Sequence, residues 1–207
     1  MVVLSTDQQG RSGSIVLIGP TGVGKTAVGK ILAGLLGWRL VELDDLRSIW
    51  YPEFGLDPDI ERSAMERGGL LELVAAWKPY ELFSVERVMK EFPDNTVITF
   101  GGGQSVYVDS GQIQRAKEAL QAASRVILME PAEHGEESMH ILMDRLREDP
   151  FVTEQRNPDE FLRAFAPVLK MQLQSESNRL LATELIVIGH STPEEIAHHV
   201  VATMEAD

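Results

Sequence analysis

Residues 15–26 read IVLIGPTGVGKT, and this stretch decides the fold. Its last eight residues, Gly19 to Thr26, match the phosphate-binding pattern G-x-x-x-x-G-K-[ST] in full. The apolar residues 15–18 before it predict a buried strand, and apolar residues recur at helical spacing over residues 28–36 after it. A strand, a glycine-rich loop and a helix thus follow each other in the order that phosphate binding requires.

The loop has a clear chemical use. Gly19, Gly22 and Gly24 can adopt backbone angles closed to other residues, so that successive N–H groups converge on phosphate oxygens. Lys25 would bridge the β- and γ-phosphates, and the Thr26 hydroxyl would complete a Mg²⁺ shell. A lysine at a helix start opposes the helix dipole unless an anion is bound, which argues against a glycine-rich turn that binds nothing. We expect ATP to contact Gly19, Thr21, Gly22, Val23, Gly24, Lys25, Thr26 and Ala27.

The composition narrows the class of protein. The chain has 207 residues, 43% of them hydrophobic, which is enough for one sizeable core. A formal net charge of -13 disfavours a general nucleic-acid-binding protein, which needs a broad basic face. The absence of cysteine indicates a reducing compartment, and no stretch approaches the roughly 20 apolar residues of a membrane span. We therefore expect a soluble cytoplasmic protein that binds neither membranes nor nucleic acid.

After the first strand, four more short apolar runs alternate with helical stretches. This alternation predicts an α/β fold, in which a five-stranded parallel sheet has helices on both faces. Together with the phosphate-binding loop, this pattern predicts the three-layer fold of P-loop NTPases. The four additional strands are predicted at residues 40–43, 96–100, 125–129 and 185–188.

The domain organisation is simple. Residues 1–13 are polar and small and predict a flexible tail before a single domain at residues 14–207. Breaks within residues 131–183 predict several short helices there, with a lid at approximately residues 144–165. Its arginines could cover the phosphates, or each could lie on a solvated helix face. The breaks are Pro131, Gly135, Pro150, Pro158 and Pro167, and the arginines are Arg145, Arg147, Arg156 and Arg163.

Carboxylates follow the second predicted strand, in the sequence Glu42-Leu43-Asp44-Asp45. Ligands of an open parallel sheet bind beyond the carboxyl ends of its strands, so these acids should face the phosphate-binding loop. One acid could hold hydrated Mg²⁺ and one could take a proton from a substrate hydroxyl. Alternation along the strand puts Glu42 and Asp44 on one face, and we favour Asp44. The alternative is that Asp44 or Asp45 only caps the next helix.

Three glycines, Gly101 to Gly103, follow the third predicted strand. They allow a ligand to approach the backbone closely, although they could also form a strained turn into a helix. The histidines lack metal-ligand spacing with partner acids and receive no role. The tryptophans are interpreted as packing residues, with the alternative that residues 50–52 and 77–80 wall a substrate pocket.

Three motifs, Gly19 to Thr26, Asp44 and Gly101 to Gly103, together resemble those of shikimate kinase and its relatives in the nucleoside-monophosphate-kinase group of P-loop kinases. The resemblance covers about residues 14–205. It implies that the loop binds MgATP, that Asp44 contacts the acceptor hydroxyl and shares Mg²⁺ with Thr26, and that the glycines line the acceptor site. The expected partners are therefore ATP, Mg²⁺ and a small hydroxylated substrate.

The same resemblance implies further site residues. Arg145 and Arg147 match lid arginines that act on the transferring phosphate, with Arg156 as a second lid position, and Arg147 also contacts ATP. Ser191, in the loop after the last strand, would lie near adenine. Lys78 and Arg179 occupy stretches comparable to those that bind the substrate carboxylate in shikimate kinase. Lysine lacks the planar fork of arginine, so the acceptor stays open.

Three functions remain in competition. The leading hypothesis is an ATP-dependent kinase that phosphorylates a small alcohol. The second is a nucleotide-binding regulatory protein or ATPase, although no strand after residue 90 ends in the paired acids that such proteins use to activate water. The third is a transferase that modifies tRNA, whose phosphate-binding loop can look similar. The acidic composition speaks against it.

Overall fold

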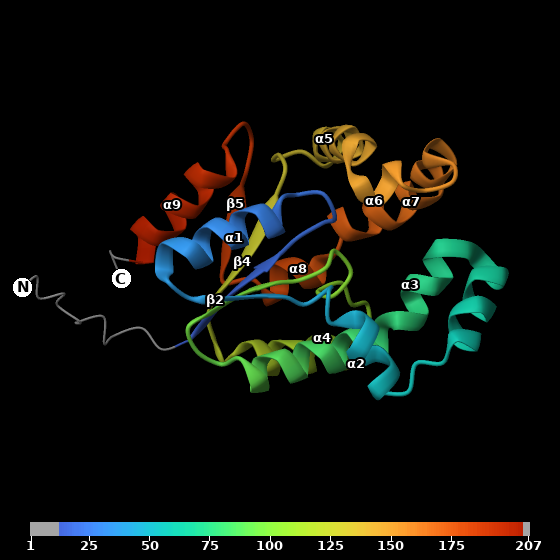
Figure 1. Ribbon diagram of the computed structural model, residues 1–207, viewed down its shortest axis with the longest axis horizontal. Coiled ribbons are helices and arrows are strands. Elements are labelled where there is room, and N and C mark those ends of the chain that lie inside the picture. The colour runs from blue at the N-terminus through green and yellow to red at the C-terminus, as the bar shows by residue number, and fades with distance from the viewer. Residues whose placement is uncertain (1–12, 205–207) are drawn as a thin grey trace, which may run out of the picture.

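A computed structural model describes residues 13–204, so the predicted tail at residues 1–13 lies outside the described part except for Gly13. Five parallel strands form one sheet with the order β2-β3-β1-β4-β5, which confirms the predicted α/β fold (Figure 1). The strands are β1 (Ser14–Ile18), β2 (Arg39–Glu42), β3 (Thr96–Thr99), β4 (Ala123–Glu130) and β5 (Glu184–Val187).

Helices cover both faces of this sheet (Figure 1). Within the described residues they are α1 (Lys25–Leu36), α2 (Arg47–Glu53), α3 (Pro58–Glu91), α4 (Ser110–Leu120), α5 (Gly135–Glu148), α6 (Pro150–Thr153), α7 (Pro158–Leu173), α8 (Glu176–Leu181) and α9 (Pro193–Met204). None of these helices is long and apolar enough to cross a membrane.

The central strand β1 is buried on both sides, as a parallel strand between two helical layers must be. Ile15 and Leu17 pack into a cluster with residues of α1 and α9. Val16 and Ile18 pack into a second cluster with residues of α3, α4 and α8. The two clusters hold the strands rigidly, so the loops at their carboxyl ends are fixed in place.

Two groups of helices extend beyond the carboxyl edge of the sheet (Figure 1). One is the α5–α7 lobe, residues 135–173, and the other is the first half of α3. The 34-residue α3 bends at Gly68 and Gly69, and Gly69 has a φ of 66° that few other residues tolerate. The chain therefore places helices on two sides of the space beyond the sheet edge.

The predicted breaks in residues 131–183 are confirmed with one exception. Four helices, α5 to α8, occupy this stretch, but α7 continues through Pro167. A proline inside a helix removes one hydrogen bond. Leu162, Val168 and Leu169 anchor α7 in the core on both sides of it, so packing outweighs the lost bond.

Candidate active site

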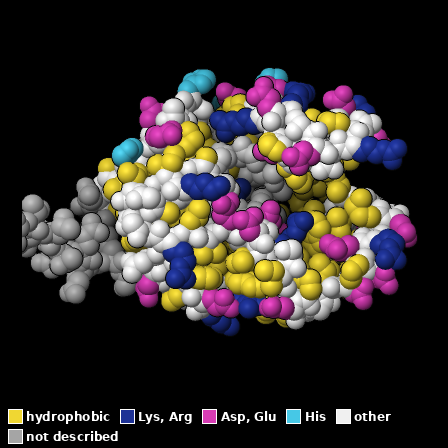
Figure 2. Space-filling model, in the orientation of Figure 1, with side chains coloured by type: hydrophobic (Ala, Val, Ile, Leu, Met, Phe, Trp, Pro, Cys, Tyr) yellow, Lys and Arg dark blue, Asp and Glu magenta, His cyan; other side chains and the backbone are white. Residues whose placement is uncertain are grey.

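A cleft of about 820 Å³ opens at the carboxyl edge of the sheet, between the α5–α7 lobe and α3. Figure 2 shows this hollow with charged side chains at its lower edge and hydrophobic side chains along its right-hand wall. The phosphate-binding loop, the acids after β2 and the glycines after β3 all contribute to its lining. The structure thus brings the three strand ends singled out in the sequence to one place.

The phosphate-binding loop, Gly19 to Thr26, has the geometry that its glycines predict. Gly19, Gly22 and Gly24 have φ values of 139°, 81° and 103°, all in the region that favours glycine. Helix α1 starts directly after Gly24, and no side chain caps its first turn. Its free N–H groups therefore face the cleft. The predicted ATP contacts that line it are Thr21, Gly22, Gly24, Lys25, Thr26 and Ala27, whereas Gly19 and Val23 do not.

Lys25 is held at the base of the cleft and is only 6% exposed. Its Nζ donates hydrogen bonds to the carbonyl oxygens of Gly19 at 2.8 Å and Pro20 at 2.9 Å. Burial lowers the pKa of Lys25 to about 8, and the nearby Asp44 carboxylate partly opposes this effect. A buried ammonium group with two carbonyl partners is ready for an anionic ligand, which would favour its charged form.

The acids at the end of β2 and just after it lie on the two faces that the alternation predicts. Glu42 and Asp44 both line the cleft, and Asp45 does not. Glu42 forms an ion pair with Lys30 at 3.3 Å. The alternative role as a helix cap is not found, because Leu46 is the N-cap residue of α2 and no side chain accepts a hydrogen bond there.

The oxygen groups at this end of the cleft suit a magnesium ion. No cluster of three or more His, Cys, Asp or Glu side chains within residues 13–204 could hold a metal by itself. Mg²⁺ usually needs only one or two protein oxygens, because water and substrate phosphates complete its shell. Thr26 and Asp44 are exposed in the cleft and offer a hydroxyl and a carboxylate of this kind.

The glycine segment, Gly101 to Gly103, lies very close to three neighbouring side chains. A Cβ atom on Gly101 would lie 2.7 Å from the carboxylate of Asp44, and one on Gly102 would lie 2.2 Å from the Thr21 hydroxyl. A Cβ atom on Gly103 would lie 2.6 Å from Glu81. The Cβ atom on Gly102 would also lie 2.7 Å from the backbone nitrogen of Thr21, so a larger residue there would displace the phosphate-binding loop. At Gly101 and Gly103 a larger residue would displace the ends of the Asp44 and Glu81 side chains. The segment therefore joins the three parts of the site.

Lys78 was expected to bind the acceptor, but it lies behind the glycine segment and does not line the cleft. Its Nζ forms an ion pair with Glu81 at 2.6 Å and donates to the Gly103 carbonyl at 2.8 Å. Glu81 is only 4% exposed and does line the cleft. Burial raises the pKa of Glu81, whereas the Lys78 charge lowers it. Lys78 is thus placed to position the glycine segment.

Arg47 and Gln172 line the cleft but were not predicted from the sequence. The Arg47 guanidinium stacks over the Trp77 ring at 4.2 Å, and among residues 13–204 it forms no ion pair. Gln172 of α7 is buried, and its Oε1 accepts a hydrogen bond from the Thr21 N–H at 2.9 Å. Arg47 lies three residues after Asp44, a spacing that could have drawn attention to it. Nothing in the sequence links Gln172 to the loop, because the two are 151 residues apart.

The remaining predicted residues are not brought into the cleft. Arg145 makes one long contact of 3.4 Å with the Val23 carbonyl, and Arg147 pairs with Asp144. Arg156 is exposed. Arg179 pairs with Glu130 at 2.7 Å, and Ser191 is exposed in the loop between β5 and α9. None of these five side chains lines the cleft.

Known structures share this architecture. Shikimate kinase from Acinetobacter baumannii superimposes with a TM-score of 0.55 and 20% identity, over 94% of this chain and 93% of that one. A gluconokinase from Sinorhizobium meliloti 1021 gives 0.55 and 17%, over 94% and 92% of the chains. A sugar kinase from Janibacter sp. HTCC2649 gives 0.55 and 13%, over 94% and 95%.

The sequence comparisons are weaker. No protein-family model matches the chain. The tRNA dimethylallyltransferase of Finegoldia magna is 29% identical in an alignment of 111 residues that covers 48% of this chain. The match spans about a third of that protein, 34% of its length. The architecture and the site together give the chain the fold of the shikimate kinase-like P-loop kinases.

Proposed function

We propose that this protein transfers the γ-phosphoryl group of ATP to a hydroxyl group of a small molecule. The observation that carries the proposal is the contact between three motifs in one cleft. Asp44 and the phosphate-binding loop both touch the glycine segment, through Gly101 and Gly102. A hydroxyl group held there would lie between a carboxylate and the terminal phosphate of a bound nucleotide.

Two features of the phosphate end of the site support a triphosphate as the ligand. The free N–H groups at the start of α1 and the charge of Lys25 would bind the β- and γ-phosphates. These donors are held before the ligand arrives, so little reorganisation opposes transfer. Arg145 is the lid arginine whose side chain reaches the loop, and we keep it as the proposed lid contact with phosphate.

At the acceptor end, Asp44 would take the proton of the attacking hydroxyl group. As the new oxygen–phosphorus bond forms, the bond between the γ-phosphorus and the β–γ bridging oxygen breaks, and ADP leaves with the electron pair. Thr26 and Asp44 would hold Mg²⁺, either directly or through water. The ion supplies charge neutralisation on the phosphate oxygens.

Measurement of ADP release with Mg²⁺ and a panel of small alcohols tests the proposal. The rate should rise with acceptor concentration for at least one class of alcohol. Asp44→Asn should reduce transfer by about 10²- to 10⁴-fold, because the proton acceptor and one proposed magnesium ligand lose their charge, and it should leave nucleotide binding nearly unchanged, because the phosphate-binding loop is intact. Asp45→Asn is the matched control, since Asp45 is an exposed neighbour outside the cleft lining, and it should retain activity. Full transfer by Asp44→Asn would contradict the assigned role.

A second candidate function has one observation in its favour. The partial likeness to tRNA dimethylallyltransferase raises transfer of a dimethylallyl group to tRNA as an alternative. The net charge of -13 opposes it, because tRNA binding needs a basic surface. Incubation with tRNA and radiolabelled dimethylallyl diphosphate separates the two. Label in the tRNA would favour the transferase, and its absence beside alcohol-dependent ADP release would favour the kinase.

A further inference from the structure

One wall of the cleft is apolar and has no part in the reaction described above. Leu70, Val74 and Trp77 lie on one face of α3, at the i, i+4, i+7 spacing that aligns side chains along a helix. Phe161, Phe165 and Val168 have the same spacing on α7. All six side chains line the cleft and belong to one hydrophobic cluster. We call them the apolar seam.

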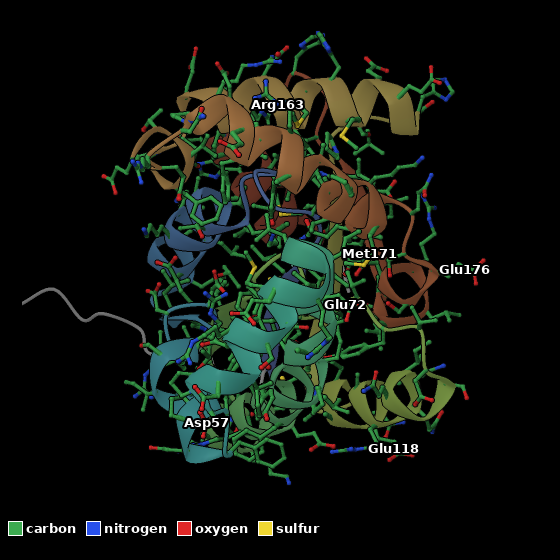
Figure 3. The ribbon with its side chains drawn as sticks, turned by 90° about the vertical axis from the view of Figure 1, so that its right-hand side faces the viewer. Asp57, Glu72, Glu118, Arg163, Met171 and Glu176 are labelled. Carbon is green, nitrogen blue, oxygen red and sulfur yellow. The ribbon has the colours of Figure 1, made fainter. Side chains whose placement is uncertain are left out.

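The two helices that carry the seam face each other. In Figure 3, the part of α3 that carries Glu72 lies below α7, which carries Arg163 and Met171. The aromatic rings of the lobe also form a group. Phe161 and Phe165 are stacked with centroids 5.7 Å apart, and Phe151 meets the Phe161 ring edge-on at 5.2 Å.

Phe151 indicates that this aromatic surface faces the cleft rather than only filling the core. It lines the cleft, yet its side chain is 50% exposed. An exposed phenylalanine beside two further rings offers planar contact area that nothing in residues 13–204 covers. Such a surface suits a flat apolar ligand, since aromatic pairs prefer stacked or edge-on contacts.

The seam adjoins the acceptor side of the site. Trp77 lies under the Arg47 guanidinium, and Arg47 follows Asp44 closely on the chain. A hydrogen bond also orients the Trp77 ring, because its Nε1 donates to Glu61 at 2.8 Å. The same helix carries Glu81 beside Gly103. In contrast, the loop with Ser191, expected near adenine, does not line the cleft.

Building on the proposed kinase function, we propose that the acceptor is an amphipathic alcohol with an aromatic ring. Its hydroxyl group lies near Asp44 and the glycine segment, and its ring lies along the apolar seam against Trp77 and Phe161. A small sugar acid would leave Phe151 and the partly exposed seam residues Leu70, Trp77 and Phe161 in contact with water. An aromatic acceptor would bury them, which is the favourable outcome for apolar surface.

Matched pairs of alcohols that differ only in a methyl or a phenyl group test this inference. Methyl and phenyl β-D-glucopyranoside form one pair, and propane-1,2-diol and 1-phenylethane-1,2-diol form another. Binding is measured by calorimetry on the full chain saturated with MgADP, and transfer is measured as ADP release from ATP. The phenyl member of a pair should bind about tenfold more tightly or better, because it buries a whole ring.

A pair of phenylalanine variants locates the effect. Phe151→Ala should lower the phenyl preference by about two- to tenfold, the range measured for aromatic contacts. Phe54→Ala is the control, because Phe54 is similarly exposed at 46% and stacks on Phe83 with centroids 4.2 Å apart, but does not line the cleft. It should leave the preference unchanged. Equal loss in both variants would overturn the assignment of the seam.

The outcomes separate this inference from the proposed function. Transfer to methyl members at equal or better efficiency would support the kinase and overturn the aromatic acceptor. Tight binding of phenyl members without any transfer would support the seam as a ring site and contradict the kinase. Two further outcomes would overturn the inference, because they would assign the seam to nucleotide binding. In the first, MgADP abolishes the binding of the phenyl members. In the second, dimethylallyl diphosphate competes with ADP and the protein shows no preference for phenyl alcohols.

Discussion

The two walls of the cleft differ in what holds them together. Around the phosphate-binding loop, the lining consists of backbone groups and charges fixed by close contacts, such as Lys25 on two carbonyls and Gly101 against Asp44. Between α3 and α7, the lining consists of apolar side chains from two helices. A single change in the polar wall removes a contact that nothing replaces. A substitution in the apolar wall removes only part of the apolar contact area, so its effect on ligand binding should be smaller and should scale with the area lost.

The largest effect should come from Lys25→Ala. This change removes the one buried ammonium group at the base of the cleft among the described residues, and phosphoryl transfer should fall by about 10³-fold. Lys117→Ala on α4 is the control, because Lys117 is exposed and does not line the cleft. Steady-state ADP release measures both. Similar losses in the two variants would contradict a special role for Lys25.

Glu81→Ala should reduce stability more than any exposed ion-pair change. It leaves the Lys78 ammonium group beneath the glycine segment without its carboxylate, and breaking a buried pair costs about 3–5 kcal/mol. Arg62→Ala removes an exposed pair with Asp59 at 2.8 Å and should cost under about 1 kcal/mol. Urea unfolding followed by circular dichroism compares them. Equal costs would mean that Lys78 finds another partner.

The polar wall should also respond to pH. Lys25 in the free protein has a pKa of about 8, so it is mostly charged at pH 7 and mostly neutral at pH 9. If the charged form binds nucleotide, ATP affinity without divalent ions should weaken by about tenfold over this range. Calorimetry at both pH values measures the change. The same titration with Lys25→Ala should be flat, and a tenfold change there would assign the effect to another group.

The smallest effect should come from Arg47→Ala, which tests the border between the two walls. Loss of its stack on Trp77 should lower the preference for phenyl alcohols by about two- to fivefold, the value of one cation–π contact. Arg87→Ala is the control, because Arg87 stacks on Trp50 at 4.5 Å outside the cleft and pairs with Glu53 and Glu91. If Arg87→Ala lowered the preference for phenyl alcohols more than Arg47→Ala, Arg47 would have no specific role in acceptor binding.

The polar wall could be predicted from the sequence because local patterns encode it. The phosphate-binding loop, Asp44 and the glycine segment each follow a strand directly. The strand ends were less certain, since pairing sets them. Strand β2 was predicted at residues 40–43 and is Arg39–Glu42, because its four residues pair with Thr96 to Thr99. Leu43 is buried but lies beyond the last pair.

The other predictions needed contacts that no local pattern contains. Lys78 and Arg179 were assigned because they lie in stretches comparable to those of shikimate kinase that bind a carboxylate. In the structure Glu81 pairs with Lys78 and Glu130 with Arg179, and Glu130 lies 49 residues from Arg179 along the chain. The apolar seam needs α3 and α7 to face each other. Helical spacing predicts an apolar face on each helix and does not say which two faces meet.

The hydrogen bond from the Thr21 N–H to Gln172 has a structural consequence. It joins the last turn of α7 to the phosphate-binding loop. Phe161 lies 11 residues earlier on the same helix, about 16 Å along its axis. One helix thus has its last turn bonded to the phosphate-binding loop and its first turn among the aromatic rings, so the two ends of the cleft share a single structural element.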